Sequence, residues 1–431
     1  MSLHVKYLLV GGGVASSEAA AAIRLHDRHG AIMLIAQEPI RPYHRPPLSK
    51  DYLLGRRQRP SLFTQSPDWF DNQHVELHTA CRAVRVDVAR QSVMLDNGQE
   101  ISYDRLLLAT GATPRPLEIP GAQMPNVYYF RTVDDADRLH HAVEKARTEG
   151  RRHDHGRGIA TVIGGELLAV ELAATLTRMG LSVDLVTAGA YPWQTVAGET
   201  TGRFIARYLQ AHGVRVHAQK SARSLEGDGR VQRVVFDDGE IPTDMVVAAI
   251  GTKVNRELIS GTSIDAERAI LADDHARANV PNVYAAGDCS AVFDPLFGKH
   301  RQFEHWEHAR ATGRLAGTNM AGGDERFAAV THFFTEAFGL SATGWGEPRL
   351  VGRRLIRGQC NVESPRFLDI GVAGDGRVAQ VISVGPRDAS EPPDATATAE
   401  MVRRRLQVGG LEEQLKDPTV DLESLLRASD T

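Results

Sequence analysis

The sequence has few cysteines and no long apolar run, and both shortages narrow the class of protein. Its three cysteines, Cys81, Cys289 and Cys360, form no C-x-x-C pair and no cysteine/histidine ligand pattern. This scatter argues against a disulfide framework and a zinc site, so no metal centre is predicted. No stretch of about 18 apolar residues is present, and the N-terminus lacks the pattern of a secretory signal. We therefore expect a cytoplasmic protein with no membrane span.

The chain also has little net charge. Lysine and arginine total 50 residues and aspartate and glutamate 54, which gives a formal net charge of −4. This balance does not favour nucleic acid or an anionic membrane surface as a partner. The length of 431 residues suits two or three domains, each able to bury its own core. The oligomeric state stays open between a monomer and a homodimer.

Two sequence patterns each occur twice. "VKYLLVGGGVASSEAAAAIRL" (5–25) contains an apolar strand, a glycine turn and a helix, and "IATVIGGELLAVELAATLTRMG" (159–180) repeats that order. "DNGQEISYDRLLLATG" (96–111) is echoed by "DDGEIPTDMVVAAIG" (237–251), each with a turn signal before an apolar strand that ends in glycine. The repeats predict two homologous Rossmann-like halves. A further strand, "NVYAAGDCS" (282–290), is expected to return to the first sheet.

The first glycine turn has the sequence context of a dinucleotide site. Gly11-Gly12-Gly13-Val14-Ala15-Ser16 follows an apolar strand and begins an alanine-rich helix. The first glycine permits the tight turn, the third lets the backbone approach a pyrophosphate, and Ser16 is small enough for close helix packing. Backbone N–H groups and the positive helix end would hold the phosphates. Glu38, 27 residues after Gly11, is the candidate carboxylate for a ribose.

Three further elements follow this turn in order: "RPYHRPPLSKDYL" (41–53), "LLLATGATPRP" (106–116) and "VYAAGDC" (283–289). With them, the chain resembles the pyridine nucleotide:flavin oxidoreductases, and within these the ferredoxin reductase and apoptosis-inducing-factor-like branch. The resemblance implies an α/β fold with two Rossmann-like, glutathione-reductase-type domains, the second inserted in the first, and an α+β C-terminal domain. The predicted boundaries are 1–114 and 252–326 for the FAD-binding domain, 115–251 for the NAD(P)-binding-like domain, and 327–431 for the C-terminal domain.

The resemblance also assigns residues to the flavin. It implies that Lys50, paired with Glu171, lies near the flavin, where a positive charge stabilises the anionic reduced ring. These two residues are the catalytic candidates. The expected FAD contacts are Gly11, Gly12, Gly13, Val14, Ala15, Ser16, Glu38, Arg45, Lys50, Val84, Ala109, Thr110, Gly111, Arg131, Asp288, His305 and Trp306.

The second glycine turn departs from the family pattern. Glu166 stands where a glycine is expected, and Thr187 stands where an acidic residue is expected. Two unit charges about 4 Å apart repel by roughly 4 kcal/mol at an effective dielectric of about 20. We therefore expect a weakened or abandoned NAD(P)H site. The expected nucleotide contacts are Gly164, Gly165, Glu166, Leu167, Leu168 and Gly251.

Two alternatives to a weakened site stay open. Glu166 points outward without effect, or the nicotinamide is held mainly near the flavin by Glu171, Gly251 and the segment around Glu304. A third departure is the absence from "AAIGTKVN" of the proline that commonly follows Gly251 in the family.

The C-terminal domain also differs from the family pattern. In "THFFTEAFG", Phe334 takes the place of a tryptophan that is frequent in the family, and so keeps an aromatic face without an indole N–H.

The leading interpretation is an FAD-dependent oxidoreductase that takes hydride from NAD(P)H. It would pass electrons to a small iron–sulfur protein or a quinone-like small-molecule acceptor. No cysteine pair occupies "RPPLSKDYL", where disulfide-reducing relatives carry theirs, so a thiol relay is not expected. The alternatives are an FAD-dependent oxidase or dehydrogenase for another substrate, and a redox-sensing flavoprotein whose pyridine nucleotide site is degenerate. The identity of the acceptor and the choice between NADH and NADPH stay open.

Overall fold

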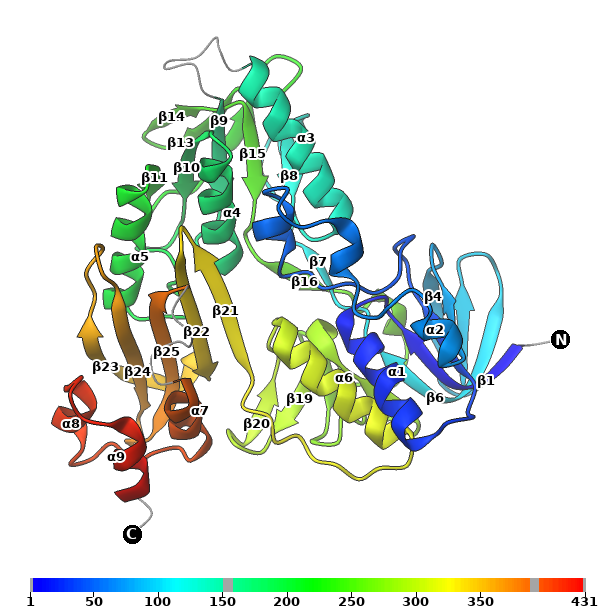
Figure 1. Cartoon of the computed structure of the whole chain (residues 1–431). Coiled ribbons are helices and arrows are strands. Elements are labelled where there is room, and N and C mark those ends of the chain that lie inside the picture. The colour runs from blue at the N-terminus through cyan, green and yellow to red at the C-terminus, as the bar shows by residue number, and fades with distance from the viewer. Residues whose placement is uncertain (1–2, 150–157, 388–394, 429–431) are drawn as a thin grey trace. The chain divides into compact units, whose positions relative to one another are not determined.

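The computed structural model describes residues 3–149, 158–387 and 395–428 (Figure 1). The chain divides into two compact units, and the second begins before the first is complete. The first unit comprises Met1–Arg45, Gln58–Thr113 and Thr252–Thr331, and the second comprises Pro46–Arg57, Pro114–Gly251 and His332–Thr431. The separate C-terminal domain at 327–431 and the other predicted domain boundaries stay predictions.

Among the described residues, the first unit contains a seven-stranded sheet in the order β3-β2-β1-β6-β5-β4, with β18 beside β6. Strands β1, β2, β3, β6 and β18 form parallel pairs, and β4 and β5 extend the sheet by antiparallel pairing. The return of β18 to the first sheet confirms the sequence prediction. The strands are β1 (Leu3–Val10), β2 (Ile32–Ile35), β3 (Val75–His78), β4 (Ala83–Asp87), β5 (Ser92–Leu95), β6 (Glu100–Leu108) and β18 (Val283–Ala285).

Two helices of the first unit, α1 (Val14–His26) and α6 (Trp306–Met320), pack closely against each other. Small residues permit this approach, because a Cβ atom added to Gly313 would lie 2.3 Å from the carbonyl oxygen of Ala15. The N-terminal turn of α1 is thereby fixed beside the sheet. The remaining elements are η2 (Arg59–Leu62), α2 (Trp69–Asn72), β7 (Ala112–Pro114), β16 (Thr252–Val254), η5 (Glu257–Ile259), β17 (Ile270–Ala272), η6 (Gly287–Cys289), β19 (Ser290–Asp294) and β20 (Lys299–Arg301).

The described part of the second unit holds a five-stranded parallel sheet in the order β11-β10-β9-β15-β8. Its central strand β9 leads through a glycine turn into helix α4, as β1 leads into α1 in the first unit. Buried apolar runs in β9, β10 and β15 are typical of parallel strands covered on both faces. The elements are β8 (Val127–Tyr129), α3 (Val133–Glu149), β9 (Ile159–Ile163), α4 (Leu167–Arg178), β10 (Ser182–Val186), α5 (Glu199–Ala211), β11 (Val214–His217) and β15 (Met245–Ala248).

The second sequence repeat forms a hairpin in each unit. In the first unit, β5 turns through Gly98 into β6, which continues without interruption to the carboxyl edge of the sheet. In the second unit, β13 (Arg233–Phe236) turns through Asp237 and Asp238 into β14 (Gly239–Pro242), and the chain then starts a separate strand, β15. Pro242 lacks a backbone N–H, which suits the end of β14. Strand β12 (Ser224–Glu226) completes this small antiparallel sheet.

The C-terminal part of the second unit is an antiparallel sheet in the order β21-β22-β25-β24-β23 (Figure 1). Asp369 of β24 is fully buried, and its carboxylate accepts hydrogen bonds from Thr201 of α5 at 2.6 Å and from Arg354 of β23 at 2.8 Å. The Thr201 bond joins the sheet to α5, and the Arg354 bond connects β23 with β24. The elements are β21 (His332–Ala337), β22 (Leu340–Gly346), η7 (Pro348–Leu350), β23 (Val351–Gln359), β24 (Arg366–Ala373), β25 (Val378–Pro386), α7 (Ala395–Arg403), α8 (Glu412–Lys416) and α9 (Leu422–Ala428).

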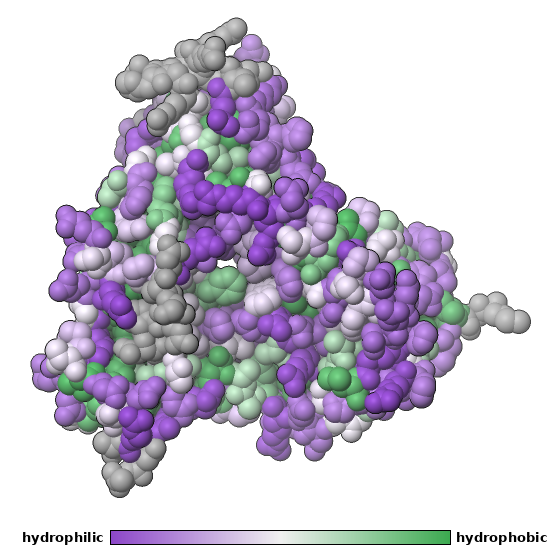
Figure 2. Space-filling model, in the orientation of Figure 1, coloured by the Kyte–Doolittle hydropathy of each residue, from purple (hydrophilic) through white to green (hydrophobic). Residues whose placement is uncertain are grey.

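Hydrophilic residues cover much of the face that Figure 2 shows, with hydrophobic residues in smaller groups among them. Leu25 of α1 and Val84 of β4 are the large apolar side chains that stand exposed among the described residues. In the part of the chain that the structure describes, no helix is both long enough and apolar enough to cross a membrane.

Candidate functional site

The first glycine turn connects β1 to α1, and its three glycines have different surroundings. Gly11 has φ +132°, and a Cβ atom there would lie 2.0 Å from the carbonyl oxygen of Ala109. A Cβ atom at Gly12 would lie 2.7 Å from that of Ala36. At Gly13, the N-cap residue of α1, a Cβ atom would meet no protein atom within 4 Å. The first two glycines therefore pack against protein, whereas the third leaves open space at the helix N-terminus.

Glu38 and Arg45, two of the expected FAD contacts, are brought together in the first unit. Their side chains form an ion pair of 2.6 Å, and the Tyr43 hydroxyl donates a hydrogen bond to the other oxygen of Glu38, also at 2.6 Å. Burial by itself lowers the pKa of Arg45, but interactions with Tyr43 and Glu38 outweigh it and raise that pKa. The carboxylate is thus held in one orientation before any ligand binds. Tyr43 was not predicted, although it stands two residues before Arg45 in the RPPLSK segment.

Other expected FAD contacts of the first unit lie at the ends of β6 and α6. After β6, the Thr110 hydroxyl donates a hydrogen bond to the backbone oxygen of Asn255 at 2.6 Å, and the Asn255 side-chain amide donates to the backbone oxygen of Thr110 at 3.0 Å. His305 is the N-cap residue of α6, and the Trp306 indole donates to His44 at 3.0 Å.

The remaining predicted FAD contacts have varied surroundings. Asp288 lies in η6, between Gly287 and the buried Cys289. Ala109 is buried, and Gly111 has φ +67°. The Val84 side chain lies on β4 and is 46% exposed.

Buried polar atoms near the first turn support a polar ligand there. The Ser16 hydroxyl is buried without a hydrogen-bond partner among the described residues. On α6, both ring nitrogens of His308 are also buried without a hydrogen-bond partner among the described residues, and the ring packs edge-on against Phe303 and Phe327. Burial lowers the pKa of His308 to about 3, so the ring is neutral at pH 7. Together with the open space at Gly13 and the oriented Glu38, the Ser16 hydroxyl fits a dinucleotide with a pyrophosphate and a ribose. Sequence reasoning did not identify His308.

Lys50 and Glu171, the predicted catalytic pair, lie together in the second unit. The Lys50 ammonium lies 2.7 Å from the Glu171 carboxylate, which is 6% exposed. Two hydroxyls also donate hydrogen bonds to this carboxylate, that of Thr335 on β21 at 2.7 Å and that of Ser49 at 2.5 Å. The Lys50 ammonium also lies 5.8 Å from the centre of the Phe334 ring, within the range of a cation–π contact. The pair is therefore fixed by three segments of the chain: η1 (Leu48–Tyr52), α4 and β21.

Ser49 and Thr335 were not predicted as site residues. Ser49 stands beside Lys50 in the RPPLSK segment, so its position was a usable signal. Thr335 is 164 residues from Glu171 and carries no local signal. Arg131 also lies in the second unit, just after β8, and its backbone N–H donates to Asp135 at 3.1 Å.

The second glycine turn connects β9 to α4 and has the backbone geometry of the first. Gly164 has φ +142°, and a Cβ atom there would lie 2.2 Å from the carbonyl oxygen of Ala249. A Cβ atom at Gly165 would lie 2.2 Å from the Thr187 hydroxyl. Glu166 is the N-cap residue of α4, followed by the half-buried Leu167 and Leu168. Gly251, with φ +102°, lies beyond the end of β15 and accepts a hydrogen bond from the Arg115 N–H at 2.9 Å.

The loop after β10 carries no charged residue from Ala188 to Thr195. Thr187 is buried, and its hydroxyl accepts a hydrogen bond from the Gly189 N–H at 3.2 Å. The packing of Gly12 on Ala36 and of Gly165 on Thr187 makes Ala36 and Thr187 equivalent positions. By the same register, Gly189 is the equivalent of Glu38. The second site therefore lacks a ribose carboxylate both at Thr187 and at Gly189.

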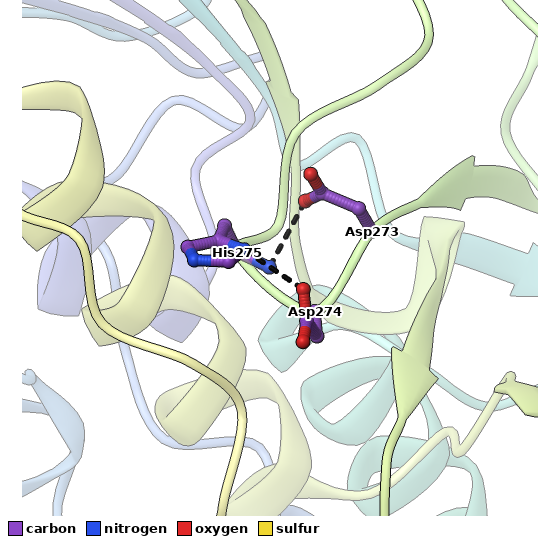
Figure 3. A group of neighbouring side chains, drawn as sticks. All are labelled: Asp273, Asp274 and His275. Carbon is purple, nitrogen blue, oxygen red and sulfur yellow. Dashed lines mark hydrogen bonds and ion pairs between the residues drawn. The ribbon is translucent and has the colours of Figure 1, made fainter. Parts of the chain in front are cut away.

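One group of side chains in the described residues has the composition of a metal site: Asp273, Asp274 and His275 (Figure 3). Asp273 accepts hydrogen bonds from the backbone N–H groups of His275 and Arg277 at 2.9 and 2.8 Å. The His275 ring contacts Asp274 at 2.8 Å and Asp324 at 3.2 Å. These contacts account for the group as a hydrogen-bonded turn of the first unit.

The three cysteines are free and separate. Cys289 is fully buried, and burial raises the pKa of its thiol. Burial also raises the pKa of Cys81, and that of Cys360 to about 11. Each thiol is therefore protonated at pH 7, which does not suit a nucleophile.

The chain matches the sequence model of the pyridine nucleotide-disulphide oxidoreductases over residues 5–313. It is 29% identical, over 97% of its length and 99% of the relative, to the anthranilate 1,2-dioxygenase system ferredoxin–NAD(+) reductase component of Burkholderia cepacia. It is 28% identical, over 100% and 98%, to the putidaredoxin reductase of Pseudomonas putida. Among solved structures, the covalent putidaredoxin reductase–putidaredoxin complex aligns with a TM-score of 0.89 and 26% identity over 99% of both chains.

The chain belongs to the pyridine nucleotide-disulphide oxidoreductase family. It is an FAD-dependent oxidoreductase with two Rossmann-like domains, the second inserted in the first, and its homologues are ferredoxin-type reductases. The resemblance seen in the sequence and the predicted fold class are confirmed. The role of each site residue stays a prediction.

Proposed function

We propose that this protein oxidises NADH or NADPH and passes the electrons through FAD, one at a time, to a small iron–sulfur protein. The observation that carries the proposal is the likeness to ferredoxin-type reductases along nearly the whole chain, C-terminal sheet included. The relatives named above are reductases of ferredoxin or putidaredoxin, and such carriers accept single electrons. A quinone-like small molecule is the second acceptor that we consider.

In this proposal the first glycine turn holds FAD. Bound FAD supplies a group that accepts two electrons as hydride and releases them singly. The open N-terminus of α1 at Gly13 suits the pyrophosphate, and Glu38, oriented by Tyr43 and Arg45, suits a ribose hydroxyl. Ala109, Thr110, Gly111, Asp288, His305 and Trp306 are the further proposed contacts of this unit.

The proposed role of Lys50 is to supply the positive charge that favours electron uptake by the flavin. Glu171 keeps this ammonium in place, and it is itself held by Ser49 and Thr335. Because all four hydrogen-bonding groups are largely buried, the pair has few alternative arrangements. Arg131 is a further proposed FAD contact.

The test is an anaerobic titration of the purified, FAD-loaded protein with NADH and, separately, NADPH. We expect loss of the flavin absorbance with at least one of them, followed by its return when an oxidised [2Fe–2S] ferredoxin is added. Menadione serves as the quinone comparison. Absence of bleaching by both nucleotides would overturn the proposed donor, and reoxidation by menadione alone would overturn the proposed acceptor.

A second candidate function is favoured by Glu166 and Thr187. These residues place a carboxylate at the second glycine turn and remove one from the usual ribose position, which suits an FAD-dependent oxidase, dehydrogenase or redox sensor that does not use NAD(P)H. Bleaching of the flavin by NADH or NADPH in the titration above excludes this candidate.

We also propose a cytoplasmic location. Its support is chemical: three free thiols are stable in a reducing compartment, whereas an oxidising one favours disulfides. Fractionation of the source cells, with the flavoprotein followed by antibody, tests it.

A further inference from the structure

Glu166 and Gly13 occupy the same position in two turns of the same shape. Gly13 has φ −96° and ψ −178°, and Glu166 has φ −91° and ψ −172°; each is the N-cap residue of the helix that follows. In the first turn the space in front of this residue contains no protein atom within 4 Å of an added Cβ. In the second turn a glutamate side chain starts from the equivalent position.

The Glu166 side chain does not cap its own helix. Its Oε1 accepts a hydrogen bond from the Thr195 backbone N–H at 3.2 Å, and its Oε2 is buried without a partner among the described residues. Trp193 is buried and has φ +63°. Its backbone N–H donates a hydrogen bond to the backbone oxygen of Gly165 at 2.8 Å and so holds the same loop against the turn. The carboxyl group therefore lies between α4 and the loop after β10, with its Oε2 buried and its Oε1 in an exposed hydrogen bond.

No charged partner balances Glu166 in the part of the chain that the structure describes. The groups that act on its carboxyl are those of Thr195, both the backbone N–H and the hydroxyl. The segments packed around it, Ala188–Thr195 from the loop and Leu167–Val170 from the first turn of α4, contain no titratable side chain except Tyr191. Burial raises the pKa of Glu166. The charge at this helix N-terminus therefore depends on one carboxyl group.

We propose that Glu166 sets the affinity of the second nucleotide site: the pyrophosphate of NAD(P)H binds when this carboxyl is protonated and is repelled when it is ionised. The inference rests on the proposed use of NAD(P)H and adds a pH dependence to that site. Because binding of the anion then takes up a proton, affinity is greatest at low pH. It decreases as pH rises through the pKa of Glu166 in the free protein.

The test measures binding instead of turnover. ADP-ribose carries the pyrophosphate without the nicotinamide, so calorimetric titration of the FAD-loaded protein with ADP-ribose, between pH 5 and pH 9, reports on this turn. Glu166→Gln keeps the side-chain shape and the acceptor for Thr195. We expect this variant to bind about ten- to hundredfold more tightly than the wild type at pH 8, with an affinity that does not change with pH. The factor is smaller than a full repulsion at about 4 Å would give, because the Thr195 N–H holds the Glu166 carboxylate on the loop after β10.

Proton uptake provides a second readout. Titrations at pH 7 in two buffers of different ionisation enthalpy show uptake of protons by the wild type and none by Glu166→Gln. Glu363→Gln is the matched control, because it removes the same charge from an exposed position between β23 and β24. It should behave as the wild type.

Three results would have different meanings. Equal ADP-ribose affinity for the wild type and Glu166→Gln at every pH overturns the role of Glu166 and leaves the proposed function intact. Tighter binding of ADP-ribose by both Glu166→Gln and Glu166→Gly than by the wild type supports the role of Glu166. If ADP-ribose, NAD⁺ and NADP⁺ fail to bind to any variant, Glu166→Gly included, the proposed use of NAD(P)H fails together with this inference.

Discussion

The turns at Gly11–Gly13 and Gly164–Glu166 have the same backbone and different chemistry. In each, the first residue has a φ value that side chains rarely adopt, and the first two residues pack against the ends of neighbouring strands. At the third residue of the first turn, Gly13, an added Cβ atom would have no protein atom within 4 Å. The fold therefore requires the first two glycines, whereas the third position of the first turn is free of packing contacts and is the one proposed to face the ligand. This division explains how the second turn keeps its shape with Glu166 in the third position.

The same division applies to the residues beyond the turns. In the first unit a carboxylate, Glu38, is held ready by Arg45 and Tyr43, whereas the equivalent Gly189 in the second unit has no side chain. The parallel sheets and their helices are nevertheless alike in the two units. The two units thus share the residues that pack the turns and differ at the positions proposed to contact the ligands.

The largest effect is expected from placing the residue of the second turn into the first. Gly13→Glu should reduce FAD affinity by about a thousandfold, because two like charges about 4 Å apart cost roughly 4 kcal/mol at an effective dielectric of about 20. FAD titration of the apoprotein, followed by flavin fluorescence, measures this loss. The variant should still fold, since Gly13 has an ordinary φ value and open space around it.

Gly13→Gln separates charge from size in this experiment. It has the length of glutamate without the charge, so it should retain more FAD affinity than Gly13→Glu. If Gly13→Glu purifies with as much FAD as the wild type, the third position does not face the pyrophosphate, and the comparison of the two turns fails.

A somewhat smaller effect, on stability instead of binding, is expected at the first position of each turn. Gly11→Ala and Gly164→Ala should each lower the free energy of unfolding by roughly 2–4 kcal/mol, because alanine is strained at positive φ and its Cβ would lie against a carbonyl oxygen. Urea unfolding of the protein measures both. Gly13→Ala is the control and should change stability little. A stability loss as large for Gly13→Ala as for Gly11→Ala would contradict the division of roles.

Local patterns identified both turns, the insertion and the return of β18, because strand periodicity and glycine spacing are properties of neighbouring residues. The pairing of Lys50 with Glu171 came from the family resemblance and not from the residues alone. Thr335 was missed, since its position beside Glu171 depends on the packing of segments that are far apart in the sequence. The Thr195 partner of Glu166 is a backbone N–H, which leaves no trace in the sequence.

The smallest effect concerns the stability cost of Glu166 itself. A carboxyl whose pKa is raised in the folded state binds its proton more tightly there than in the unfolded chain, so the folded state loses relative stability as pH rises above the ordinary value of 4.5. Glu166→Gln removes this penalty. It should match the wild type near pH 4 and exceed it in stability at pH 8, because only the wild type has to bury an ionised carboxylate there.

Urea unfolding of the wild type, Glu166→Gln and Glu363→Gln across this pH range measures the difference. Glu363 is exposed, so its variant should follow the wild-type curve at every pH. A Glu166→Gln curve parallel to the wild type from pH 4 to pH 8 would mean that the carboxyl has the same pKa in the folded and unfolded states. Glu166 would then be ionised near pH 5 in the folded protein, and the second turn would repel a pyrophosphate throughout the neutral range.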